Sequence, residues 1–98
     1  MLMRTACDAL ASGHRLELRY DGFTRVVEVH TCGETTAGND AMRVFQVRGG
    51  SVSHERTGWK LLRLDEASSG IVLGEPSAAP RPGYKRGDPA FAQIVKQV

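Results

Sequence analysis

The sequence has few cysteines and no long apolar run, and both absences narrow the class of protein. Only two cysteines occur, Cys7 and Cys32, and they form no Cys-x-x-Cys unit. We therefore expect free, mostly buried thiols and no disulfide framework. No apolar stretch approaches the ~20 residues of a membrane span. Arg4 and Asp8 interrupt the N-terminal apolar stretch, which is unlike a secretory signal. These features predict a cytoplasmic protein.

The motifs of phosphate-binding loops and of nucleophilic catalysis are also absent. The stretch FQVRGGSVSH, residues 45–54, has adjacent glycines but no following Gly-Lys-Ser/Thr, and the chain has no G-x-G-x-x-G. Ser51 and His54 lie close together on a flexible loop without a G-x-S-x-G turn, which does not predict an activated nucleophile. We interpret residues 49–58 as a polar hairpin loop. An enzyme using Ser51 with His54, or Cys32, is a third and less favoured hypothesis, so no catalytic residue is predicted.

The spacing of the histidines and cysteines does not indicate a metal centre. His14, His30 and His54 form no His-x-x-x-His or His-Glu-x-x-His motif, and no cysteine pair accompanies them. A surface site built from His30 and Cys32 is the one arrangement left open. We expect neither a metal nor a cofactor.

The length and the charge describe one small domain with a basic C-terminal half. Ninety-eight residues form a single domain, residues 1–98, with a core large enough to fold alone. The net charge of +2 is the sum of −2 in residues 1–40, which hold 4 Lys/Arg and 6 Asp/Glu, and +4 in residues 41–98, which hold 9 and 5. A basic half is compatible with a partner that carries phosphate.

The N-terminal third predicts a helix followed by a hairpin. Apolar residues recur at helical spacing from Leu2 to Leu10, and Gly13 follows at a C-cap position, which predicts a helix over residues 2–12. Asp21-Gly22 separates two alternating segments, 15–20 and 23–30, and is a strong hairpin signal. A two-residue loop sets the pairs Tyr20–Phe23, Leu18–Arg25, Leu16–Val27 and Arg15–Glu28.

Three further strands are expected over residues 42–48, 59–64 and 71–73. Residues 31–40 are turn-forming throughout, and the alternation shifts between Val44 and Phe45, which predicts a bend or bulge there. Five short strands with turn signals predict a mainly β fold, a small strongly bent sheet or partly open barrel over residues 15–75.

Residues 76–98 differ in character. Prolines concentrate between Glu75 and Gly87 and predict a crossing segment. Asp88-Pro89 is typical of a helix start, and Phe91, Ile94, Val95 and Val98 fall on one helical face, which predicts a C-terminal helix. No internal repeat is present.

Basic and aromatic residues alternate on the predicted strands. The residues concerned are Arg25, Arg43, Lys60 and Arg63 with Tyr20, Phe45 and Trp59. Such a surface suits a nucleotide or a single-stranded nucleic acid, because cations contact phosphates and rings stack on bases. The alternative is that the aromatics are core and the arginines are ordinary exposed charges. Arg25 falls in the apolar phase, so it must reach the rim or line a pocket, whereas Glu28 and His30 fall in the outward phase.

The order of these elements resembles the bacterial WYL domain. The resemblance rests on RLELRYDG, on RVVEVH at residues 25–30, and on AMRVFQVRGGS and GWKLLRLDEA, and it covers about residues 2–75. Val44-Phe45-Gln46 replaces the Trp-Tyr-Leu triplet of that family, and Val29 stands where proline is common. The resemblance implies an Sm-like β-barrel without catalytic activity that acts as a regulatory, ligand-sensing module. It also implies a ligand-facing set, which comprises Arg25, His30, Phe45 and Arg63, with Gln46 and Lys60 as neighbours.

Two functions follow as expectations. The first is a non-enzymatic module that binds a nucleotide, a single-stranded nucleic acid or a small anionic ligand on a basic and aromatic face. The alternative is a protein-interaction or dimerisation module that uses the exposed edges of the sheet.

Overall fold

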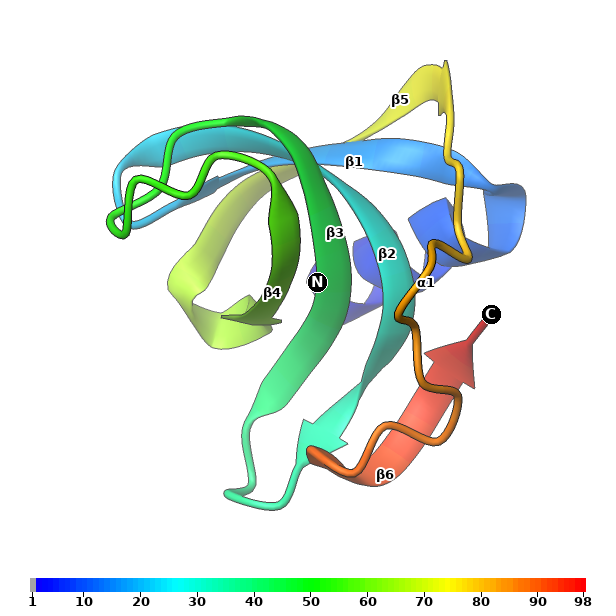
Figure 1. Cartoon of the computed structure of the whole chain (residues 1–98). Helices are drawn as coiled ribbons and strands as arrows, with labels where there is room; N and C mark the ends of the chain where they lie inside the picture. Colours follow the sequence, from blue (N-terminus) through cyan, green and yellow to red (C-terminus); the bar gives the residue numbers. More distant parts are fainter. Residues whose placement is uncertain (1) are drawn as a thin grey trace.

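The computed structural model describes residues 2–98 as one helix and a six-stranded antiparallel sheet. The elements, in chain order, are α1 (Leu2–Ser12), β1 (His14–Tyr20), β2 (Phe23–Thr35), β3 (Asp40–Gly49), β4 (Gly58–Arg63), the 3₁₀ turn η1 (Leu64–Glu66), β5 (Ala67–Pro76) and β6 (Phe91–Gln97). The strands lie in the order β4-β3-β2-β1-β5, and β6 pairs with β2. The sheet curls strongly, and α1 packs at its side (Figure 1).

The three predicted hairpin pairs nearest the turn are confirmed, and the fourth, Arg15 with Glu28, is an ion pair. Tyr20 pairs with Phe23, Leu18 with Arg25 and Leu16 with Val27. Asp21 and Gly22 both have positive φ, at 52° and 78°, which is the backbone that an Asp-Gly turn of this kind requires. The turn therefore fixes which side chains of β1 and β2 face the core.

The core lies between the inner face of the curled sheet and α1. The buried set comprises Ala6, Ala9, Leu16, Leu18, Val27, Val29, Cys32, Met42, Val44, Leu62 and Leu64. Ala6 and Ala9 are fully buried, and their small side chains let α1 approach the strands closely. The predicted helix over residues 2–12 is confirmed, and both cysteines are free thiols.

The sheet does not close into a barrel. Within residues 2–98, β4 pairs only with β3, and β5 pairs only with β1. The mainly β class is confirmed, while the structure has six strands instead of five. The fifth predicted strand, residues 71–73, is the middle of a longer strand that runs from Ala67 to Pro76.

The predicted C-terminal helix is wrong, because residues 91–97 form β6. Residues 31–35, which were expected in a turn, extend β2 beyond the end of β1 and present a free edge, and β6 pairs with that edge. Asp88 does not cap a helix. Its side chain binds Arg43, and its carbonyl accepts the amide of Phe91 in a turn. Tertiary pairing has overridden the helical spacing of four apolar residues.

The bulge predicted between Val44 and Phe45 is also placed differently. β3 alternates without interruption there, with Val44 and Gln46 buried and Phe45 half-buried on the other face. The register between β2 and β3 steps instead at Val47 and at His30, each of which is an extra residue in its strand. Since His30 and Thr31 follow one another at a bulge, both face outward.

Candidate ligand-binding pocket

The outer face of the sheet is covered by the crossing segment, residues 77–90, which joins β5 to β6 and runs along the side of β2 (Figure 1). Glu28 anchors this segment to the sheet. Its carboxylate accepts hydrogen bonds from the Nε of Arg81, from the amide of Ala78 at 2.8 Å and from the Nε of Arg15 at 3.0 Å. Burial opposes ionisation of Glu28, but these three donors outweigh it and lower its pKa.

His30 forms a second anchor beneath the segment. Its Nε2 accepts a hydrogen bond from the amide of Arg81 at 3.0 Å, and its Nδ1 lies 3.0 Å from the carbonyl of Glu28. Because an amide only donates and a carbonyl only accepts, the ring is neutral and carries its proton on Nδ1. Burial lowers the pKa of His30, in agreement with the neutral form.

Aromatic rings surround His30 on the outer face. Its ring centroid lies 4.7 Å from that of Trp59 and 5.1 Å from that of Tyr84. Trp59 also contacts Phe45, its cross-strand partner, edge to face at 5.5 Å, and Arg81 lies 4.5 Å over the Phe45 ring. The hydroxyl of Tyr84 lies within hydrogen-bond distance of Thr31 and of two backbone carbonyls, so only the ring of Tyr84 is offered outward.

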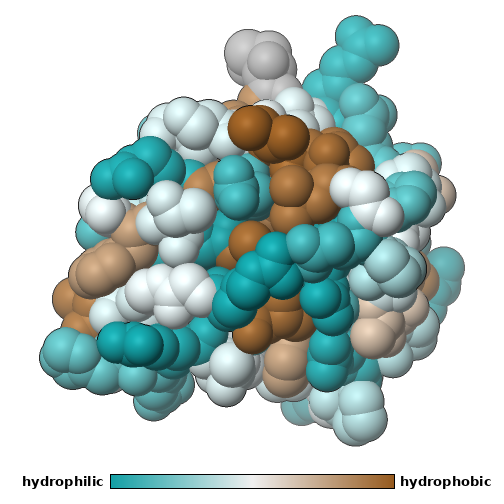
Figure 2. All heavy atoms as spheres, turned by 90° about the horizontal axis from the view of Figure 1, so that it is seen from above, coloured by the Kyte–Doolittle hydropathy of each residue, from teal (hydrophilic) through white to brown (hydrophobic). Residues whose placement is uncertain are grey.

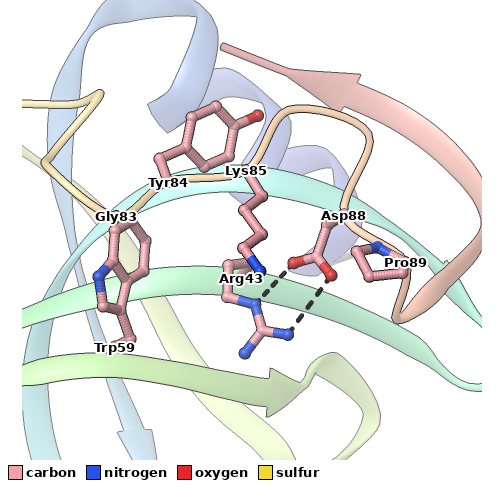
Figure 3. Close-up of a pocket in the computed structure, with 7 residues that line it drawn as sticks. All are labelled: Arg43, Trp59, Gly83, Tyr84, Lys85, Asp88 and Pro89. Carbon is pink, nitrogen blue, oxygen red and sulfur yellow. Dashed lines mark hydrogen bonds and ion pairs between the residues drawn. The ribbon is translucent and has the colours of Figure 1, made fainter.

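A pocket of about 250 Å³ opens between this aromatic group and the end of the crossing segment. It is lined by Arg43, Trp59, Gly83, Tyr84, Lys85, Asp88 and Pro89. Figure 3 shows Arg43 and Trp59 on the sheet and Tyr84, Lys85 and Asp88 on the crossing segment, with Lys85 and Asp88 pointing toward Arg43. The rings of Trp59 and Tyr84 are nearly parallel, at 21°, with centroids 6.4 Å apart.

The polar groups of the pocket are mostly donors. Arg43 Nε donates to the buried carboxylate of Asp88 at 2.7 Å, and Nη2 lies 3.5 Å from the other carboxylate oxygen. Within residues 2–98, the Nη1 of Arg43, the Nζ of Lys85 and the indole N–H of Trp59 have no hydrogen-bond acceptor. The pocket therefore offers two cationic groups and an aromatic wall with an unused donor.

The residues that the WYL resemblance implies do not gather in this pocket. Arg25 is buried near the β1–β2 turn, where it donates to the carbonyl of Tyr20 and to Gln46 and pairs with Asp21. The amide of Gln46 donates to the carbonyls of Gly50 and Arg56, so Gln46 holds the loop of residues 50–57 in place. Arg25 is therefore held by partners inside the protein, and its side chain is only 3% exposed.

The other four residues of that set have separate surroundings. Phe45 and His30 support the aromatic wall from the outer face, whereas Lys60 reaches the hydroxyl of Ser51 at 3.2 Å. Arg63 is half-exposed and paired with Asp65. Glu28 and His30 lie on the outer face of the sheet, and both are fully buried because the crossing segment covers them.

Tyr84, Lys85 and Asp88 were missed by sequence reasoning, while Arg43 and Trp59 were only part of a broader basic and aromatic group. A signal did exist in the run RPGYKRGD, where aromatic and basic residues follow a proline-rich stretch. The partner of that run on β3 could not be read from the chain, because 40 residues separate Arg43 from Gly83.

The other features that bear on function are the serine loop, the metal-binding residue types and the helix. The Ser51 hydroxyl lies 3.0 Å from that of Ser53 and contacts Lys60, and among residues 2–98 no hydrogen bond joins it to the His54 ring. No cluster of three His, Cys, Asp or Glu side chains suited to a metal occurs in that range. The only α-helix in the described part of the chain, α1, is too short to cross a membrane.

Comparisons of this chain with protein-family models, with curated protein sequences and with solved structures found no significant match.

Proposed function

We propose that this domain is a non-enzymatic module of WYL-like type that binds an anionic ligand carrying a planar ring, and that the pocket between β3, β4 and the crossing segment is its site. A nucleotide is the simplest such ligand, and a single-stranded nucleic acid offers the same groups in a polymer. The observation that carries the proposal is the placement of Arg43 and Lys85, with open donors, beside the ring of Trp59.

The cations of Arg43 and Lys85 and the ring of Trp59 are complementary to the phosphate and the base of a nucleotide. Guanidinium and ammonium donors bind phosphate oxygens. Stacking of a base on an aromatic ring contributes about 1–3 kcal/mol. Lys85 is exposed and supplied by the crossing segment, so it reaches a ligand without breaking an ion pair of the protein.

Fluorescence of Trp59, the only tryptophan in the chain, tests this proposal directly. The four nucleoside 5′-monophosphates and a short oligothymidylate are titrated at low and moderate salt, and we expect quenching that weakens as salt rises. Lys85→Ala should weaken binding about tenfold, in line with ~1.5 kcal/mol for a hydrogen bond to a charged group. Arg4→Ala, on the exposed face of α1, is the control of equal charge and should bind like the original chain. Absence of quenching by every probe at low salt would contradict the proposal.

A second candidate function is protein interaction through the edge of β5. Among residues 2–98 this strand pairs only with β1, and Ile71 and Val72 on it are 54% and 37% exposed. Seen from the side where β1 and β5 lie at the top of Figure 1, the surface shows apolar side chains gathered among polar ones (Figure 2). An unpaired edge with apolar residues accepts a further strand. Light scattering of the original chain and of Ile71→Lys tests self-association through this edge. We expect an oligomer for the original chain and a monomer for Ile71→Lys, and a monomeric original chain would contradict this function.

A further inference from the structure

The charges inside the pocket set a limit on the charge of its ligand. Arg43 and Lys85 contribute two positive charges and Asp88 one negative charge, so the lining carries a net charge of +1. The nearby Glu28 carboxylate pairs with both Arg81 and Arg15, and all three residues lie outside the lining. The His30 ring, which lies behind Trp59 and Tyr84, is neutral for the reason given above.

The negative charge of Asp88 is retained within this pocket. It is buried, and its Oδ1 accepts the amide of Ala90 at 2.9 Å while its Oδ2 accepts Arg43. Burial disfavours the charged form, but the hydrogen bonds from Arg43 and Ala90 and the charge of Lys85 hold the pKa of Asp88 below its ordinary value. The carboxylate is therefore ionised at neutral and mildly acidic pH.

Asp88 occupies only one edge of the Arg43 guanidinium. In the described part of the chain, the Nη1 of Arg43 and the Nζ of Lys85 have no hydrogen-bond acceptor. These two donors suit a single anionic group that presents two oxygens. A second negative charge on the same ligand group finds no further open cation in the described lining and lies near the Asp88 carboxylate. It also raises the cost of removing the ligand from water, which grows with the square of the charge, whereas the attraction of the lining grows only in proportion to it.

We propose, resting on the function proposed above, that the pocket selects a singly charged anion attached to a planar ring over a doubly charged one, and that Asp88 sets this selectivity. The favoured class is the phosphodiester of a cyclic nucleotide, in contrast to the phosphomonoester of an ordinary nucleotide. The phosphomonoester loses its second charge only when the pH falls below its second pKa, which is about 6.

Two pairs of probes isolate this charge: the 3′,5′-cyclic monophosphates of adenosine and guanosine, and the corresponding 5′-monophosphates. Each pair shares base and sugar. Titrated by Trp59 fluorescence at a pH of about 7.5, the cyclic form should bind at least about fivefold tighter. At a pH of about 5.5 the difference should shrink, because most of the phosphomonoester then carries a single charge.

Asp88→Asn tests the role assigned to the carboxylate, since its Oδ1 can still accept the amide of Ala90. This variant should bind the 5′-monophosphates several-fold tighter and lose the preference for the cyclic form. If it does not fold, Lys85→Gln replaces it. Because Lys85→Gln leaves Asp88 in place, it should weaken both forms while the cyclic form keeps its advantage, and loss of that advantage contradicts the inference.

The outcomes separate the two proposals. Equal affinities, or a tighter 5′-monophosphate in the original chain, overturn the charge selectivity and leave the nucleotide pocket standing. An unchanged preference in a folded Asp88→Asn protein removes Asp88 from the explanation and overturns the inference. Failure of both probe forms to quench Trp59 at low salt counts against the pocket itself.

Discussion

The Nε2 atom of His30 accepts a hydrogen bond from the backbone amide of Arg81 at 3.0 Å. This contact joins a bulge residue of β2 to a residue of the crossing segment 51 positions later in the chain. Because the acceptor must be a neutral imidazole, the attachment of the crossing segment depends on pH.

Stability should therefore decline below the ordinary histidine pKa of 6.5. The folded state lowers the pKa of His30, so between the folded and unfolded values the unfolded chain binds more protons, and acid favours unfolding. Urea titrations across the range from neutral to mildly acidic pH measure this decline. His30→Gln should be less stable at neutral pH but should lose part of the pH dependence, and the difference between the two curves isolates His30 from His14 and His54. A histidine signal in NMR spectra that titrates at 6.5 or above and is assigned to His30 would disprove the explanation.

Loss of Glu28 should be far more damaging than loss of Glu75, although each carboxylate binds two arginines. Glu28 is fully buried and also accepts the amide of Ala78, so Glu28→Gln should lower the free energy of unfolding by roughly 2–3 kcal/mol. Glu75 is exposed, and Glu75→Gln is the matched control with a small effect. Chemical denaturation of both variants gives the comparison, and equal losses would show that burial does not decide the value of these ion pairs.

Gly33→Ala should release β6, because a Cβ at Gly33 would collide with the backbone of Gln93 and Ile94. Gly74→Ala is the control, since a Cβ on that β5 residue meets no atom within 4 Å. Hydrogen exchange of residues 91–97 should become fast in Gly33→Ala and stay slow in the control. Slow exchange in both proteins would mean that β2 and β6 can separate enough to admit a methyl group.

Gln46→Ala should affect stability and leave ligand binding unchanged. The substitution removes donors to the carbonyls of Gly50 and Arg56 and an acceptor for Arg25, at a cost of about 2 kcal/mol or more. Gln93→Ala, on the exposed face of β6, should cost little. The free energy of unfolding and the nucleotide affinity are measured on the same samples. Weakened binding by a folded Gln46→Ala protein would contradict this prediction and would support the ligand-binding role of Gln46 that the family resemblance implied.

Local patterns predicted the N-terminal helix and the first hairpin accurately. Alternation in β1 and the Asp-Gly turn determine the register of the hairpin, because both signals act over a few residues. The same reasoning failed at the C-terminus, where Ile94 and Val95 suit either a helix or a strand. The free edge of β2 at Thr31–Thr35 decided between them, and that edge exists only once β1 has ended.

The candidate site was less predictable than the fold, for a related physical reason. Glu28 and His30 occupy outward positions in β2, and period-two reasoning assigns such positions to solvent. Their burial depends on a proline-rich segment that has no periodicity of its own. The pocket combines Arg43 and Trp59 of the sheet with residues of that segment, so only the basic and aromatic character of the surface could be anticipated.

The division of the pocket between the sheet and the crossing segment also links ligand binding to thermal denaturation. Neither half forms the pocket alone, so a ligand of the pocket binds the folded chain and not the unfolded one. Mass action then raises the unfolding free energy by about 2.7 kcal/mol when the free ligand is present at a hundred times its Kd. In a domain of this size a change of 1 kcal/mol shifts Tm by roughly 4–8 °C. A metabolite library can therefore be ranked by melting temperature, and shifts that are clearly smaller in Lys85→Ala would assign each hit to this pocket.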